Sequence, residues 1–135
     1  MTDEPPRYAP DLAEIERLAE RARASLPREL AVHIQDVVLR VEDFCDEETE
    51  REMELESPYD LLGLYRGVSK LDESVATARG QPDMIFLYRV PLLVYWIETG
   101  EELYALVRHT MIHEIGHHFG FSDDDMEWLE REEPR

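Results

Sequence analysis

Histidine is concentrated near the C-terminal end of the chain, in a pattern that suits metal chemistry. Four of the five histidines fall between residues 109 and 118, where His113, Glu114 and His117 complete the pattern H-E-x-x-H. Residues four apart on a helix lie one turn above another, so the two imidazoles can bind one cation. Glu114 is rotated by only about 100° from His113, which places its carboxylate beside an open metal position. The motif predicts a Zn²⁺ site with a general base at its side.

A catalytic zinc ion also needs a third protein ligand. Gly120 can adopt a left-handed conformation that ends the helix and turns the chain back toward the metal. Asp123, three residues later, then supplies a carboxylate, which is an acceptable zinc donor. Asp124, Asp125 and Glu127 compete with it, because a turn after Gly120 can present any of them. The aspartates are also typical of the solvated first turn of a following helix.

These residue types predict hydrolysis of a peptide bond. Zinc lowers the pKa of a bound water toward neutrality, and Glu114 accepts the proton and passes it to the departing amine. The presence of Glu114 favours catalysis over a structural zinc site, which has no use for a base. Two alternatives stay open. The site can bind metal for structure or sensing only, or the chain can be a peptide-binding scaffold without turnover.

The motif requires a helix that is anchored on its other side. At about 100° per residue, apolar side chains gather opposite the histidine pair. They are Tyr104, Met111, Ile112, Ile115 and Phe119. We predict a helix over residues 101–119, with Glu101 and Glu102 as its acidic first turn and Gly120 as its stop. Ser122 can cap a last helix that ends at Glu130.

The rest of the chain predicts an α+β fold, a small mixed sheet of about three strands with flanking helices. The predicted strands span residues 36–41, 61–67 and 84–89, the last of them central. The predicted helices before the motif span residues 11–25 and 91–97. An acidic stretch at 42–56 indicates a mobile loop or frayed helix, and residues 72–81 are rich in turn formers.

A peptide substrate is expected to lie extended beside a sheet edge, where main-chain hydrogen bonds hold it. Leu62 to Arg66 is the candidate edge, and an ordinary strand inside the sheet is the alternative. The glycines of this segment, Gly63 and Gly67, indicate a bulge or a close backbone approach, and a substrate backbone can supply the latter.

Other polar residues have more ordinary interpretations. His109 and His118 flank the motif, where a histidine is more often a supporting or surface residue than a ligand. His33 is expected to be structural or solvated. Tyr65 and Tyr88 can donate a hydrogen bond to an oxyanion, but tyrosine in a strand usually serves packing, so neither is placed in the catalytic set.

The composition is that of one folded domain. The chain has 135 residues, 43% of them hydrophobic and 34% charged, which suits a globular protein rather than a disordered one. We predict a single domain over residues 1–135, with an extended lead-in at 1–10 and a flexible tail at 131–135. The formal charge of -18 disfavours nucleic acid and anionic membrane surfaces as partners.

Several features indicate a cytoplasmic location by elimination. Cys45 is the only cysteine, so an intramolecular disulfide is excluded. The N-terminus lacks a basic start followed by an apolar run, and the longest apolar stretch, Val90 to Ile97, is too short to span a bilayer. The oligomeric state is undetermined, and a monomer is the default expectation.

The segment from His113 to Asp123 spells H-E-x-x-H-x-x-G-x-x-D and resembles the zincin metallopeptidases of the metzincin-like type. Together with Ile85 to Arg89, it is similar to the small prokaryotic minimal zincins, and the likeness covers about Pro27 to Trp128. It implies a stripped-down zincin core that hydrolyses peptides or proteins. In such a core, zinc is bound by His113, His117 and Asp123, and Glu114 is the general base.

The chain departs from the metzincins proper at two points. They have a third histidine where this chain has Asp123, and they have a methionine-containing turn below the metal. Met126 lies too close to the motif to be assigned to that turn.

Overall fold

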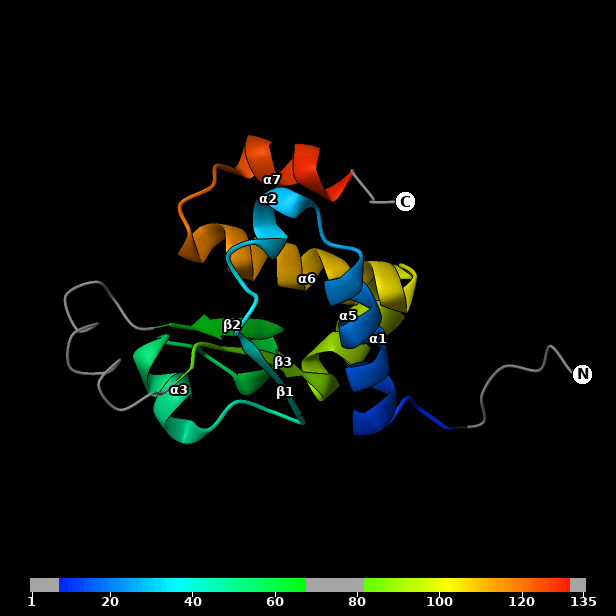
Figure 1. Cartoon of the computed structure of the whole chain (residues 1–135). Coiled ribbons are helices and arrows are strands. Elements are labelled where there is room, and N and C mark those ends of the chain that lie inside the picture. The colour runs from blue at the N-terminus through cyan, green and yellow to red at the C-terminus, as the bar shows by residue number, and fades with distance from the viewer. Residues whose placement is uncertain (1–7, 68–81, 132–135) are drawn as a thin grey trace, which may run out of the picture.

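The computed structural model describes residues 8–67 and 82–131 (Figure 1). Most of the predicted lead-in and tail, and all of the turn-rich segment 72–81, lie outside the described residues. The helices are α1 (Leu12–Ala24), α2 (Arg28–Ala31), α3 (Glu47–Glu52), η1 (Pro58–Asp60, a 3-10 helix), α5 (Arg89–Thr99), α6 (Leu103–His118) and α7 (Asp123–Glu130). The strands are β1 (Val38–Glu42), β2 (Gly63–Arg66) and β3 (Met84–Tyr88). The α+β prediction is confirmed.

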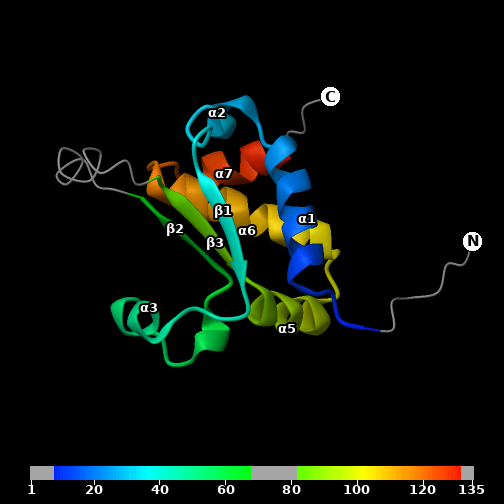
Figure 2. The ribbon, with the colours of Figure 1, turned by 60° about the horizontal axis from the view of Figure 1, so that its bottom comes forward.

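The sheet has the order β1-β3-β2, so the most apolar strand is central, as predicted (Figure 2). Strand β1 is parallel to β3 and β2 is antiparallel to it, which makes the sheet mixed. Ile85 and Leu87 alternate along β3 and are buried. Their burial follows from the two-residue period of a strand, which points alternate side chains to one face.

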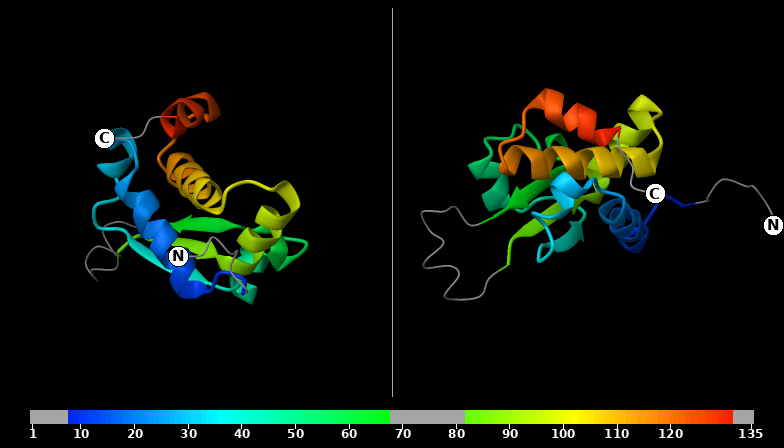
Figure 3. Two further views of the ribbon diagram at one scale, coloured as in Figure 1. Left: turned by 90° about the vertical axis from the view of Figure 1, so that its right-hand side faces the viewer. Right: turned by 45° about the horizontal axis from the view of Figure 1, so that its top comes forward.

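The motif helix α6 lies between the sheet and α7 (Figure 3). Met111, Ile112 and Ile115 have no exposed surface, as the predicted apolar face requires. Its start differs from the prediction. Glu102 is the extended N-cap residue, and no acidic residue lies in the first turn. Gly100 ends α5 in the left-handed region. Glu101 and Glu102 therefore lie in the connection between α5 and α6.

After α6 the chain turns back on itself. Gly120 has φ +82°, and the N–H of Phe121 donates to the carbonyl of Gly116 at 2.9 Å, which closes the helix end. Ser122 and Asp125 then form a capping box that starts α7. A Cβ on Gly116 would overlap the fully buried Met126, so the two helices approach closely at this point. The predicted stop, cap and last helix are confirmed.

Two local predictions need correction. A Cβ on Gly63 would lie 2.9 Å from Thr110 Cγ2 of α6 and 3.0 Å from the Phe86 carbonyl oxygen, so protein, rather than a substrate backbone, makes the close approach. The acidic stretch contains a short helix, α3, because the Asp46 carboxylate accepts the N–H of Thr49 at 2.7 Å and caps it.

Among the described residues, none of the helices has the length and apolar character of a membrane span.

Candidate metal centre

The histidine pair of the motif lies on α6 with one turn between its members. The ring centroids of His113 and His117 are 5.9 Å apart, and the ring planes are nearly perpendicular. The side chain of His113 is 29% exposed and that of His117 is 58% exposed. The helix therefore presents both imidazoles on a side that solvent can reach.

Asp123 begins α7 and returns to the second histidine of the motif. Its Oδ1 lies 3.6 Å from Nε2 of His117. Two ligands on one tetrahedral zinc ion, each about 2.1 Å from it, are separated by about 3.4 Å. Asp123 and His117 are thus spaced almost as two ligands of one ion. The third predicted ligand does not join them in this structure, because the donor atoms of His113, His117 and Asp123 are not all within 4.8 Å of one another. Two imidazoles with a carboxylate are a donor set that zinc accepts. The competing Asp125 is occupied by the capping box with Ser122.

Glu114 lies between α6 and the edge strand β2. The main-chain N–H of Tyr65 faces its carboxylate and favours the charged form. Burial raises the pKa of Glu114, while the nearby His117 ring and the Tyr65 N–H oppose the shift. A carboxylate with a raised pKa is better matched to proton transfer near neutral pH than a fully solvated one.

The pairing of β2 with β3 explains why the N–H of Tyr65 is free for Glu114. The N–H of Tyr88 donates to the carbonyl of Leu62 at 2.9 Å. The main-chain N–H and carbonyl groups of an antiparallel strand point to its two sides alternately from residue to residue. Those of Leu64 and Arg66 point toward β3, and those of Gly63 and Tyr65 point to the outer edge.

The other aromatic residues near the motif make packing contacts. His118 stacks on Tyr65 with ring centroids 4.0 Å apart, and His33 stacks on Phe119 at 4.6 Å. The Tyr65 hydroxyl donates to the Asp83 carboxylate at 2.7 Å, and its pKa is raised by burial and by this carboxylate. Tyr88 is buried. These contacts agree with packing roles for the two tyrosines.

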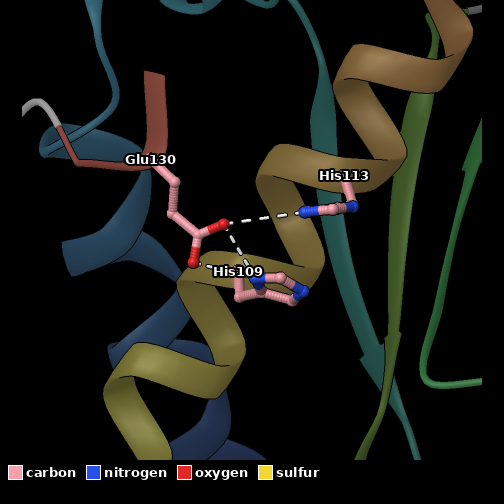
Figure 4. Close-up of side chains that lie close together, drawn as sticks. All are labelled: His109, His113 and Glu130. Atoms are coloured by element: carbon pink, nitrogen blue, oxygen red, sulfur yellow. Dashed lines mark hydrogen bonds and ion pairs between the residues drawn. The ribbon is translucent and has the colours of Figure 1, made fainter. Parts of the chain in front are cut away.

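A second cluster of metal-binding side chains lies further along the same helix pair (Figure 4). Nδ1 of His109 is 2.8 Å from both carboxylate oxygens of Glu130, and Nε2 of His113 is 3.6 Å from Glu130 Oε1. One donor atom from each of the three residues lies within 4.8 Å of the others. We call this cluster the His109 triad.

The sequence interpretation missed Glu130 as a donor. Asp123 and Glu130 are seven residues apart, or about two helical turns, so they share one face of α7. His109 and His117 are eight residues apart on α6, which is also about two turns. A chain that turns back after Gly120 packs α7 antiparallel to α6, which pairs Asp123 with His117 and Glu130 with His109. These two spacings could have predicted Glu130 as a donor.

The electrostatics of His113 favour its metal-binding form. Its pKa is lowered, first by burial and then by the neighbouring His109 and His117 rings, while Glu130 and Asp123 act in the opposite direction. A lowered pKa keeps the imidazole neutral, which is the form that coordinates a cation.

One comparison with known proteins identifies a family. A family model described as zincin-like metallopeptidase matches residues 34–132, well over half of the chain. The matched segment includes the sheet, α6 and α7. The search of curated proteins found no match.

Proposed function

Since the chain belongs to the zincin-like metallopeptidase family, we propose that it is a zinc-dependent peptidase that acts on peptides or proteins. The observation that carries the proposal is the return of Asp123 to 3.6 Å from His117. His117 lies on the helix whose motif also carries His113, one turn away, and the partly buried Glu114.

His113, His117 and Asp123 are the residues that would hold the metal. Bound there, Zn²⁺ would act as a Lewis acid toward the scissile carbonyl and the attacking water. Asp123 lies on a different helix from the histidines, so the capped start of α7 sets the position of Asp123. The ligand set therefore depends on the turn at Gly120 as much as on the motif itself.

Glu114 would serve as the general base. Its raised pKa suits acceptance of a proton from the attacking water and its release to the departing amine. The N–H of Tyr65 at the sheet edge faces the carboxylate and favours its charged form. The carboxylate therefore lies next to β2 before a substrate binds.

An extended peptide would bind along β2. This strand is the antiparallel edge of the three-stranded sheet, and the main-chain groups of Gly63 and Tyr65 point outward from it. Addition of a strand at an exposed edge uses main-chain hydrogen bonds, which hold a peptide with little dependence on its sequence. The same edge carries the contact to Glu114, so a peptide bound there would pass close to the base.

The test compares the zinc-loaded chain with Glu114→Gln on a broad peptide library, with zinc content measured for each. Glutamine retains an acceptor oxygen for the Tyr65 N–H, so the fold and the metal should persist. Loss of a general base is expected to lower kcat by about 10²- to 10⁴-fold. Glu98→Gln, at an exposed position of α5, is the matched control and should cleave as the wild type does.

Undiminished cleavage by Glu114→Gln would remove Glu114 from the role of base. A wild-type chain that binds zinc but cleaves no peptide of the library would favour the alternative, a metal-binding peptide scaffold without turnover.

A further inference from the structure

We propose that the His109 triad is a second position for a divalent cation such as Zn²⁺, and that it competes with the peptidase site for His113. A cation in the triad would withdraw His113 from the pair with His117 and so inhibit cleavage. The cation-binding part of this proposal is independent of the peptidase activity, whereas the inhibitory part rests on the proposed function.

The donor atoms of the triad already converge (Figure 4). Nε2 of His113 is 3.6 Å from Glu130 Oε1, close to the roughly 3.4 Å expected between two ligands of one tetrahedral zinc ion. His109 and Glu130, at 2.8 Å, are joined by a hydrogen bond and need to separate by about half an ångström. Two imidazoles and a glutamate form the donor set of one common class of catalytic zinc site.

The main chain at Glu130 is held in place by the protein core. Arg108, which is buried on α6, donates from Nη1 to the main-chain carbonyl of Glu130 at 2.7 Å. The same guanidinium donates to Ser25 Oγ at 2.9 Å, which ties it to the end of α1. The close approach of Gly116 and Met126 keeps α7 packed on α6. These contacts fix the point of α7 from which the Glu130 side chain reaches His109 and His113.

The triad lacks the group that makes the motif hydrolytic. In the motif, His113 is followed by Glu114. In the triad, His109 is followed by Thr110, which is buried and whose hydroxyl donates to the Leu106 carbonyl at 2.9 Å. A cation in the triad would therefore have no carboxylate in the position of the base. This difference supports a role of the triad in binding a cation rather than in hydrolysis.

Competition follows from the single ring that the two positions share. Nε2 of His113 faces Glu130 in this structure, and one nitrogen binds one cation. Two divalent cations this close together would also repel each other. Because the two positions exclude each other, the ratio of their occupancies does not depend on the zinc concentration. A fixed share of the zinc-loaded chains would hold the ion in the triad and would be inactive for cleavage.

The binding test is made in the full chain with His117→Ala and Asp123→Ala, in which the peptidase site has lost two donors. Co²⁺ should still bind with about one ion per chain and give a visible absorption band that Zn²⁺ removes. Adding His109→Asn or Glu130→Gln should weaken Co²⁺ binding at least about tenfold, since the loss of an outer-shell partner alone costs that much. Glu127→Gln, exposed on the same helix, is the control and should leave binding unchanged.

Absence of Co²⁺ binding in the double variant, or binding that neither substitution weakens, would overturn the second site. The competition is tested by comparing cleavage by the wild type and by Glu130→Gln, both saturated with zinc. Glu130→Gln weakens the triad and should therefore raise the cleavage rate per zinc-loaded chain. An unchanged or lower rate would overturn the competition and leave the binding result intact, and a chain without peptidase activity would still report on the binding.

Discussion

The main-chain N–H of Tyr65 faces the carboxylate of Glu114 and favours its charged form. This proximity joins the outer edge of the sheet to the helix that carries the metal motif. It places the predicted base next to the strand on which we propose that a peptide binds.

Asp123→Ala should weaken zinc binding by at least about tenfold, because it removes the proposed third ligand and even outer-shell changes have effects of that size. Competition with a chromogenic chelator measures the affinity. Asp124→Ala, which changes the neighbouring exposed aspartate, is the matched control and should bind zinc as the wild type does. A larger loss in Asp124→Ala than in Asp123→Ala would show that the third ligand is misassigned.

Gly116→Ala should destabilise the protein by about 1–3 kcal/mol, because the added methyl group overlaps Met126 in a closely packed interface. Urea unfolding gives the free energy. In a Gly116→Ala, Met126→Ala double variant the two changes should be coupled, because the smaller side chain makes room for the new methyl group. Strictly additive effects would mean that the two positions do not meet.

Zinc should raise the free energy of unfolding by about 2.7 kcal/mol at a free concentration one hundred times its Kd, since only the folded chain can bring the proposed ligands to one ion. Thermal unfolding with and without EDTA measures this effect. The rise should be abolished in a His113→Ala, His117→Ala double variant. A similar rise in that variant would locate the stabilising metal elsewhere.

Tyr65→Phe should lower the free energy of unfolding by about 1 kcal/mol, because the buried hydroxyl loses its hydrogen bond to Asp83. Urea unfolding is again the measurement. Tyr8→Phe, at a largely exposed tyrosine, is the control and should have little effect. Equal stability of Tyr65→Phe and the wild type would mean that the hydrogen bond contributes nothing net.

The local features of the site were predictable from sequence because they depend on short-range spacing. The four-residue step from His113 to His117 places both rings on one side of any helix, and Gly120 followed by Ser122 specifies a stop and a new cap. The central position of Met84 to Tyr88 in the sheet followed from its apolar composition.

Features that depend on tertiary packing were missed or misinterpreted. The meeting of Glu130 with His109 depends on the close approach of Gly116 and Met126, which fixes how α7 lies on α6. Gly63 was interpreted as making room for a substrate, but the neighbour is Thr110 of α6. Spacing along the chain does not identify which element packs against a glycine, because several elements can supply the same contact.

The most direct test of the metal assignment is a crystal structure of the chain loaded with one equivalent of zinc, with anomalous scattering recorded at the zinc edge. The account predicts one strong peak about 2.0–2.1 Å from Nε2 of both His113 and His117, with an Asp123 oxygen as the next ligand. A peak elsewhere, with no density between these two rings, would contradict it.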